Sequence, residues 1–205
     1  MSWFEDKNIP AFAIFGRYEG LQIAGTKPDK TQAIAEAARE LIGLGHRRVV
    51  LMTRRMRRLP SPGATEQAFL DALTAGGVVS GSYHLPDWPE TVAGFHERLD
   101  SLFKFSPPSA LILDEVAFFM AAMDFCANRG LRVPQDLSLM CLDSSPHFHW
   151  CRPAISHIAW DSEPVVRRVL RWVKKSGRRK RDQQQIYTHA EFVRGGTIGS
   201  AKKGN

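Results

Sequence analysis

The sequence predicts an α/β protein with mostly parallel sheets and flanking helices. Helical and strand-like segments alternate from about residue 20 onward, which is typical of βαβ units. Two short runs, at 48–52 and 110–113, are rich in the aliphatic residues of buried parallel strands. We therefore expect one α/β body, which the 205 residues could divide into two lobes.

The first unit of this pattern is a helix followed by a strand. Asp29 is a candidate helix cap, with Gln32 three residues later. Apolar residues then recur at the spacing of one helical face, namely Ile34, Ala37, Ala38, Leu41 and Ile42. Gly45 suits the left-handed conformation that ends a helix, and the strand at 48–52 follows.

Three further helices are expected from the same periodicity. Their apolar faces run from Thr65 to Leu73, from Val92 to Leu102 and from Val116 to Ala127. The strand at 110–113 precedes the last of these helices, and another strand is expected at 137–142.

The final third of the chain predicts one helix and one strand. Asp161 or Ser162 can cap a helix that has Pro164 in its first turn. The pattern assigns one set of its residues to the core, namely Val165, Val166, Val169, Leu170 and Val173. It assigns another set to solvent, namely Arg167, Arg168, Arg171, Lys174 and Lys175. We expect a mobile loop at 176–185, a strand at 186–193 and a frayed tail from 195.

Composition favours a cytoplasmic protein. No apolar run is long enough to span a membrane, and the N-terminus lacks the pattern of a signal peptide. The three cysteines show no CxxC spacing, which fits a reducing compartment. The formal net charge is +7, with basic clusters at 54–58 and 167–181. These clusters could attract nucleic acid or could form solvated faces.

Polar residues follow three of the expected strands. Thr53 and Arg54 follow the first, Asp114 and Glu115 the second, and Asp143 with Ser144 the third. In open α/β sheets, ligands bind outside the carboxyl ends of the strands. Carboxylates there can accept hydrogen bonds from sugar hydroxyls. The alternative is that Asp114 and Glu115 only cap the following helix.

Two tryptophans are candidates for stacking on a ligand ring. Trp88 lies in the polar segment 86–89, and Trp160 lies just before the last helix. Large aromatic residues in such segments also serve as half-buried packing, so this second interpretation stays open.

No motif indicates catalysis, a cofactor or a metal. The chain lacks a phosphate-binding GxxxxGK[ST] loop, a GxGxxG turn and a GxSxG elbow. His147, His149 and Cys151 lie close together, but a fourth ligand at a recognisable spacing is missing. We therefore expect a binding module and not an enzyme.

Several segments resemble the LacI/GalR family of transcription regulators. LIGLGHRRV at 41–49 resembles the family segment LIxLGHRRI, and GLRVPQDLSL at 130–139 resembles GLRVPxDVSV. EQAFLDAL at 66–73 is similar to RxxGFxxAL, and FVRGGT at 192–197 to VVRGST. IP at 9–10 and AIFGR at 13–17 resemble the strand before the first crossover.

This resemblance implies an effector-binding domain of the periplasmic-binding-protein-like type I fold. Such a domain binds a sugar or related metabolite in the cleft between two lobes. By position, Asp143 matches an acidic effector contact, Trp88 lies near an aromatic that flanks the sugar, and Trp160 occupies a cleft position. Two positions depart from the family: Glu115 replaces an asparagine, and Thr65 replaces a ligand-binding arginine. A third departure is Ser144, which replaces the second aspartate of a pair.

The resemblance also implies an incomplete N-terminal lobe. We expect four segments: a remnant of that lobe at 1–28, the C-terminal lobe at 29–158, a crossover helix at 159–176, and a loop, last strand and tail at 177–205. The sequence is similar, too, to sensors that carry a GntR-type winged-helix head, through the segments 3–4, 15–17 and 86–88. No DNA-binding head is recognisable in the chain itself.

The sequence thus predicts the ligand-sensing part of a bacterial transcription regulator. We expect a carbohydrate-like effector, a homodimer, and DNA contact only through a separate head. The alternative from another class is an oligomerisation or partner-binding remnant that no longer binds an effector, since an incomplete lobe would expose apolar surface.

Overall fold

Two compact units make up the protein. The computed structural model describes residues 3, 7, 9–18, 20–176 and 182–202. One unit joins Met1–Lys30 with Trp160–Ala190, and the other joins Thr31–Ala159 with Glu191–Asn205. The chain therefore passes between the units three times. Within the described residues, no helix has the length and apolar character needed to cross a membrane.

The first unit is a three-stranded sheet with one helix packed on it. The strand order is β1–β2–β7, and both neighbouring pairs are parallel. Its elements are β1 (Phe12–Ile14), β2 (Ala24–Pro28), α7 (Ser162–Ser176) and β7 (Gln185–Thr188). α7 packs against β2, and the rings of Phe12 and Trp172 lie 5.3 Å apart. Gly25 allows Tyr18 to approach, because a side-chain carbon at residue 25 would lie 2.7 Å from the Tyr18 ring.

The prediction for the faces of α7 is partly wrong. Val166, Leu170 and Val173 were expected in the core but are 52%, 55% and 53% exposed. Arg168 was expected in solvent but is buried, because its Nη1 donates to Asp182 Oδ2 and its Nη2 to Asp182 Oδ1, both at 2.9 Å. The hydrogen bonds from Arg168 hold the pKa of Asp182 below its ordinary value. Of the mobile loop expected at 176–185, residues 177–181 lie outside the described part of the chain.

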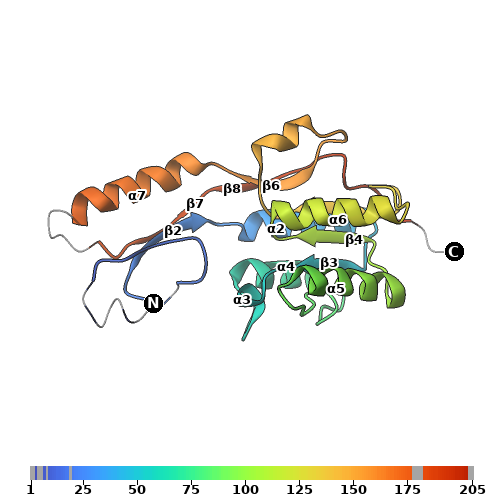
Figure 1. The fold of residues 1–205 in the computed structure, drawn as a ribbon, viewed down its shortest axis with the longest axis horizontal. Helices are drawn as coiled ribbons and strands as arrows, with labels where there is room; N and C mark the ends of the chain where they lie inside the picture. Colours follow the sequence, from blue (N-terminus) through green and yellow to red (C-terminus); the bar gives the residue numbers. More distant parts are fainter. Residues whose placement is uncertain (1–2, 4–6, 8, 19, 177–181, 203–205) are drawn as a thin grey trace. The chain divides into compact units, whose positions relative to one another are not determined.

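The second unit is built on a five-stranded sheet with the order β3–β4–β5–β6–β8. The strands from β3 to β6 are parallel to their neighbours. The sheet strands are β3 (Val49–Met52), β4 (Ala110–Leu113), β5 (Ser138–Cys141), β6 (Ser156–Trp160) and β8 (Ala190–Val193). The helices are α2 (Thr31–Gly43), α3 (Arg55–Arg58), α4 (Ala64–Ala75), α5 (Val92–Phe105), α6 (Val116–Asn128) and the short 3-10 helix η1 (Pro146–Trp150). The predicted α/β class with mostly parallel sheets is confirmed (Figure 1).

Helices cover both faces of this sheet. α6 packs against β4 and β5, and a buried cluster joins the apolar residues of α5 and α6 to Val50, Met52, Leu111 and Leu113. Successive strand residues point to opposite faces. The alternate residues of β3 and β4 therefore point to the other face of the sheet, where they are also buried. α2 and α4, which pack against each other, cover that face. Every residue of β3, β4 and β5 is buried, so polar groups gather only at the strand ends.

The C-terminal segment is held more firmly than the frayed tail that the sequence predicted. Thr197 and Ile198 are buried, and the Leu139 amide donates to the Thr197 carbonyl at 2.8 Å. The Ala201 amide donates to the Leu44 carbonyl at the same distance. Residues 203–205 lie outside the described part. The expected strand at 186–193 is two strands, β7 and β8, in different sheets.

His46 connects this tail to the amino ends of the strands. Its Nε2 lies 2.9 Å from the Gly199 carbonyl, which can only accept, so Nε2 carries the hydrogen. Nδ1 then accepts from the Ser109 hydroxyl, also at 2.9 Å. The imidazole is 1% exposed, and burial lowers its pKa from the ordinary value of 6.5. His46 is therefore neutral in the folded protein at neutral pH.

The buried His46 should make the second unit less stable in mild acid. The unfolded chain takes up a proton on this residue below about pH 6.5, while the folded protein resists protonation until a lower pH. The free energy of unfolding should fall through that window, by at most about 1.4 kcal/mol per pH unit for this group. Urea titrations at several pH values between 7.5 and 5, followed by tryptophan fluorescence, would measure the slope.

The variant His46→Gln should have a shallower pH dependence than the wild type over the same window. His149→Gln is the matched control, because His149 is exposed. A His46→Gln variant that keeps the full wild-type slope would show that another group controls acid stability.

Candidate functional site

The carboxyl ends of β3, β4 and β5 bring together most of the predicted site residues. The register pairs Met52 with Leu113 and Leu113 with Cys141, so the residues that follow these strands are neighbours. The Arg54 amide donates to Asp114 Oδ2 at 3.3 Å. The negative charge of Asp143 acts on Glu115. The second unit thus gathers Arg54, Asp114, Glu115 and Asp143 at one edge of its sheet.

Arg54 and Glu115 form a bidentate ion pair across two strand ends. Arg54 Nε donates to Oε1 of Glu115 at 2.5 Å, and Nη2 donates to Oε2 at 2.8 Å. The guanidinium carbon lies 5.2 Å from the ring centroid of Phe118, and Nη1 is 3.5 Å from Glu90 Oε2. The bonds from Arg54 lower the pKa of Glu115, against the opposite effects of burial and of Asp143. Glu115 is therefore ionised, and both members of the pair remain about one-third exposed.

This pair decides against the capping interpretation of Glu115. Glu115 occupies the cap position of α6, yet its side chain makes no capping hydrogen bond to the helix. Its carboxylate is directed to Arg54 instead. Asp114 is 1% exposed and pairs with Arg57, whose Nε lies 3.3 Å from Oδ2. The buried Asp114 therefore connects the ends of β3 and β4 through Arg54 and Arg57, while the Glu115 carboxylate stays accessible to solvent.

Trp88 lies inside the core behind this edge. Its ring is 3% exposed and meets Phe95 and Phe118 edge-on, at 5.6 Å and 5.3 Å. Its Nε1 donates to the Thr53 carbonyl at 3.0 Å. Of the two interpretations of Trp88 that the sequence left open, this geometry supports packing in the core. Trp88 fixes the end of β3 and presents little ring surface to a ligand.

Arg58 is a buried support that the sequence did not single out. Its Nη1 donates to the Thr53 carbonyl at 2.7 Å, and its Nη2 donates to the Trp88 carbonyl at 3.1 Å. Nη2 also pairs with Asp87, and this contact lowers the pKa of that carboxyl. In the sequence, Arg58 is one member of a basic cluster, and nothing local distinguishes it from the exposed Arg55.

Thr65, Asp143 and Trp160 are not partners in the ion pair between Arg54 and Glu115. Thr65 is half-buried in the first turn of α4, and its hydroxyl makes no hydrogen bond within the described part of the chain. Asp143 accepts from the Ser144 amide at 3.0 Å. Trp160 belongs to the first unit, where its ring lies 5.5 Å from that of Phe15. Within the described residues, no group of three or more His, Cys, Asp or Glu side chains could hold a metal ion.

The architecture belongs to the class of periplasmic-binding-protein-like folds: two α/β units joined by three chain crossings, with polar groups at the carboxyl ends of parallel strands. Residues 38–198 match the family described as periplasmic binding protein-like domain. The match covers most of the chain, and the chain belongs to this family. The resemblance to LacI-family regulators seen in the sequence is confirmed by the relatives and the structural neighbours.

One curated relative is an HTH-type transcriptional regulator from Streptomyces limosus. It is 28% identical over 159 residues, which are 75% of this chain and 44% of that protein. The chain thus spans less than half the length of this relative.

Solved structures of LacI-family regulators share the fold. A LacI-type regulator from Bacillus cereus subsp. cytotoxis matches with a TM-score of 0.83 and 16% identity, over 98% of this chain and 72% of that one. A LacI-family regulator from Enterococcus faecium, solved with bound ribose, matches with a TM-score of 0.80 and 14% identity, over 97% and 74%.

Removing the buried guanidinium of Arg58 should destabilise the site edge. In Arg58→Met, the carbonyl of Trp88 and the carboxylate of Asp87 lose their contacts with Arg58. The free energy of unfolding should fall by about 2 kcal/mol, the typical cost of leaving a buried polar group unsatisfied. Urea denaturation followed by tryptophan fluorescence would measure it. Arg55→Met is the control and should change stability by less than about 0.5 kcal/mol. Equal stabilities of the two variants would contradict the supporting role of Arg58.

Proposed function

We propose that this chain is the effector-sensing part of a transcription regulator and binds a sugar or related hydroxylated metabolite at the carboxyl ends of β3, β4 and β5. The observation that carries the proposal is the placement of Glu115 and Asp143 at adjacent strand ends of a parallel sheet. This is the edge at which open α/β sheets bind ligands. The ribose bound by the Enterococcus faecium neighbour supports the same ligand class.

The ion pair at this edge favours hydroxyl donors over an anionic ligand. Arg54 already makes two short bonds to Glu115 and lies close to Glu90. An anion would have to displace these carboxylates. A sugar hydroxyl can donate to the outer lone pairs of Glu115 and to Asp143 without breaking the pair.

DNA binding would reside in another part of the whole protein. The Streptomyces limosus relative carries the name of an HTH-type regulator, and the chain matches 44% of it. Within the site, the arginines at 54, 57 and 58 pair with acidic side chains, so this basic cluster is not a free positive surface. We therefore assign the chain to sensing and assign DNA contact to a separate segment.

Self-association is a second candidate function, favoured by two large exposed apolar side chains on the second unit. α6 is apolar on most of its circumference, and Met120 on it is exposed. The 3-10 helix η1 adjoins α6 through Phe119 and Phe148, whose rings lie 6.0 Å apart, and its Trp150 is 77% exposed. Exposed aromatic and methionine side chains are enriched at interfaces between protein chains. We propose a homodimer whose interface includes Met120 and Trp150.

Effector binding should depend on Glu115 and Asp143. D-ribose and a panel of neutral mono- and disaccharides would be screened by thermal shift, because a ligand raises the melting temperature by mass action. For a sugar that binds, Glu115→Ala and Asp143→Ala should abolish binding in calorimetry while the circular dichroism spectrum stays unchanged. Asp100→Ala, an exposed acid on α5, should bind like the wild type. Unchanged affinity in both site variants would overturn this site.

The dimer should depend on the exposed side chains of α6 and η1. In Met120→Glu combined with Trp150→Ala, a charge and a lost aromatic ring should leave a monomer in light scattering coupled to gel filtration. Phe105→Ala is the control, because Phe105 is equally exposed but lies at the end of α5. A wild type that is monomeric at 100 μM, or a dimer that the double variant retains, would argue against this interface.

A further inference from the structure

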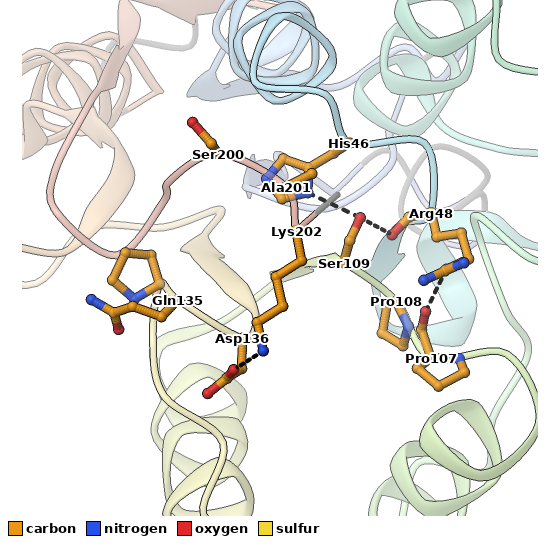
Figure 2. A pocket seen from close by; sticks show the side chains of 11 residues that line it. His46, Arg48, Pro107, Pro108, Ser109, Gln135, Asp136, Ser200, Ala201 and Lys202 are labelled. Atoms are coloured by element: carbon orange, nitrogen blue, oxygen red, sulfur yellow. Dashed lines mark hydrogen bonds and ion pairs between the residues drawn. The ribbon is translucent and has the colours of Figure 1, made fainter. Parts of the chain in front are cut away.

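A pocket lies at the amino ends of β3, β4 and β5, at the edge of the sheet opposite to the proposed effector site. It has a volume of about 140 Å³ and is formed by three loops and the tail (Figure 2). The loops contribute His46 and Arg48, residues 107–109 and residues 134–136, and the tail contributes residues 200–202. All these segments belong to the second unit. The pocket shares no lining residue with the proposed effector site, which belongs to the same unit.

The walls of this pocket are held in place. Pro107, Pro108 and Pro134 line it, and each ring fixes the backbone of its loop. The buried His46 forms another wall, and its hydrogen bonds to Ser109 and Gly199 hold the loop before β4 against the tail. A ligand would thus meet a preformed site, which lowers the entropic cost of binding.

Arg48 points a fixed guanidinium at the pocket. Its Nε donates to the Pro107 carbonyl at 2.7 Å, which fixes the plane of the group. In the described part of the chain, its two terminal nitrogens have no hydrogen-bond or ion-pair partner, and the same holds for the side-chain amide of Gln135. Figure 2 shows Arg48 on one side of the pocket and Lys202 with Asp136 on the other. Donors therefore converge on the space from two sides.

The charge around the pocket is positive. Asp136 is the one acid among its lining residues, and two cations already share it. Arg132 Nε donates to Asp136 Oδ2 at 2.9 Å, and Lys202 pairs with Oδ1. These contacts hold the pKa of Asp136 well below its ordinary value, so its charge is permanent but fully engaged. Among the described residues, Arg48 has no acidic partner.

We propose that this pocket binds a small oxyanion, a phosphate or carboxylate group, through the terminal nitrogens of Arg48. Lys202, on the opposite side, supplies a further positive charge. Guanidinium groups bind such anions through paired, charge-assisted hydrogen bonds. The volume of about 140 Å³ leaves room for a phosphate or carboxylate group. A bound anion would join the tail to the loops before β4 and β5 and so stabilise the second unit.

The test uses the whole 205-residue chain and inorganic phosphate. At constant ionic strength set with sodium chloride, phosphate should raise the melting temperature saturably, and calorimetry should give one site. Arg48→Gln should weaken phosphate binding at least tenfold. Arg47→Gln is the matched control, because Arg47 carries the same charge one residue away but does not line the pocket and donates to the carbonyls of Ile42 and His46. It should bind like the wild type.

A parallel titration with acetate identifies the group that is recognised. Binding of acetate that Arg48→Gln also weakens supports a carboxylate site, and binding of phosphate alone supports a phosphate site. In two-dimensional NMR spectra of the folded wild type, the affected amides should include residues 107–109 and 134–136. A phosphate effect that is equal in Arg48→Gln and Arg47→Gln, or that does not saturate, would overturn the proposal. Loss of sugar binding at Glu115 would leave it untouched, since the two sites lie at opposite strand ends.

Discussion

The parallel register of β3, β4 and β5 is the constraint on which the rest of the second unit depends. All residues of these strands are buried, so polar side chains can occupy only the two edges where the strands begin and end. Four residues span roughly 13 Å at about 3.3 Å per residue. Parallel pairing sends every carboxyl end to one edge and every amino end to the other. Two polar clusters from distant parts of the chain are therefore collected on either side of one thin apolar layer.

Local patterns in the sequence predicted β3, β4, β5 and most helices of this unit, but they did not predict β6. Apolar runs predicted β3 and β4 almost to the residue, because a strand buried on both faces has few alternatives. The face of α7 was predicted less well. Helical periodicity assigned Val166 to the core and Arg168 to solvent, whereas Arg168 is buried with Asp182, fourteen residues further along. A periodic pattern describes the helix alone, and it contains no information on such a partner. The firmly held tail was missed for the same reason, since its bond to His46 joins residues 153 positions apart.

The candidate site shows the same division between local and distant information. Acidic residues after β4 and β5 could be predicted as neighbours, because the rule for parallel strand ends requires only the strand positions. The ion-pair partners of these acids could not be predicted from the sequence. The bond between Arg54 and Glu115 spans 61 residues, and the burial of Trp88 depends on Phe118 from α6. The sequence alone left two interpretations of Trp88 open, and only the packing of the core distinguishes them.

Charge distribution separates the two edges more sharply than the net charge of +7 indicates. At the carboxyl edge, the arginines of the cluster at 54–58 are largely engaged by acids of the same chain, such as Glu115 and Asp114. Ion pairing leaves lone pairs there but little free positive charge. At the amino edge, the one lining acid is shared by two cations, and Arg48 keeps two nitrogens without partners among the described residues. A neutral hydroxylated ligand suits the carboxyl edge, because that edge offers hydrogen-bond acceptors. An oxyanion suits the amino edge, because that edge offers positively charged donors. A single rigid sheet can thus hold two proposed sites of opposite preference without any motion of its strands.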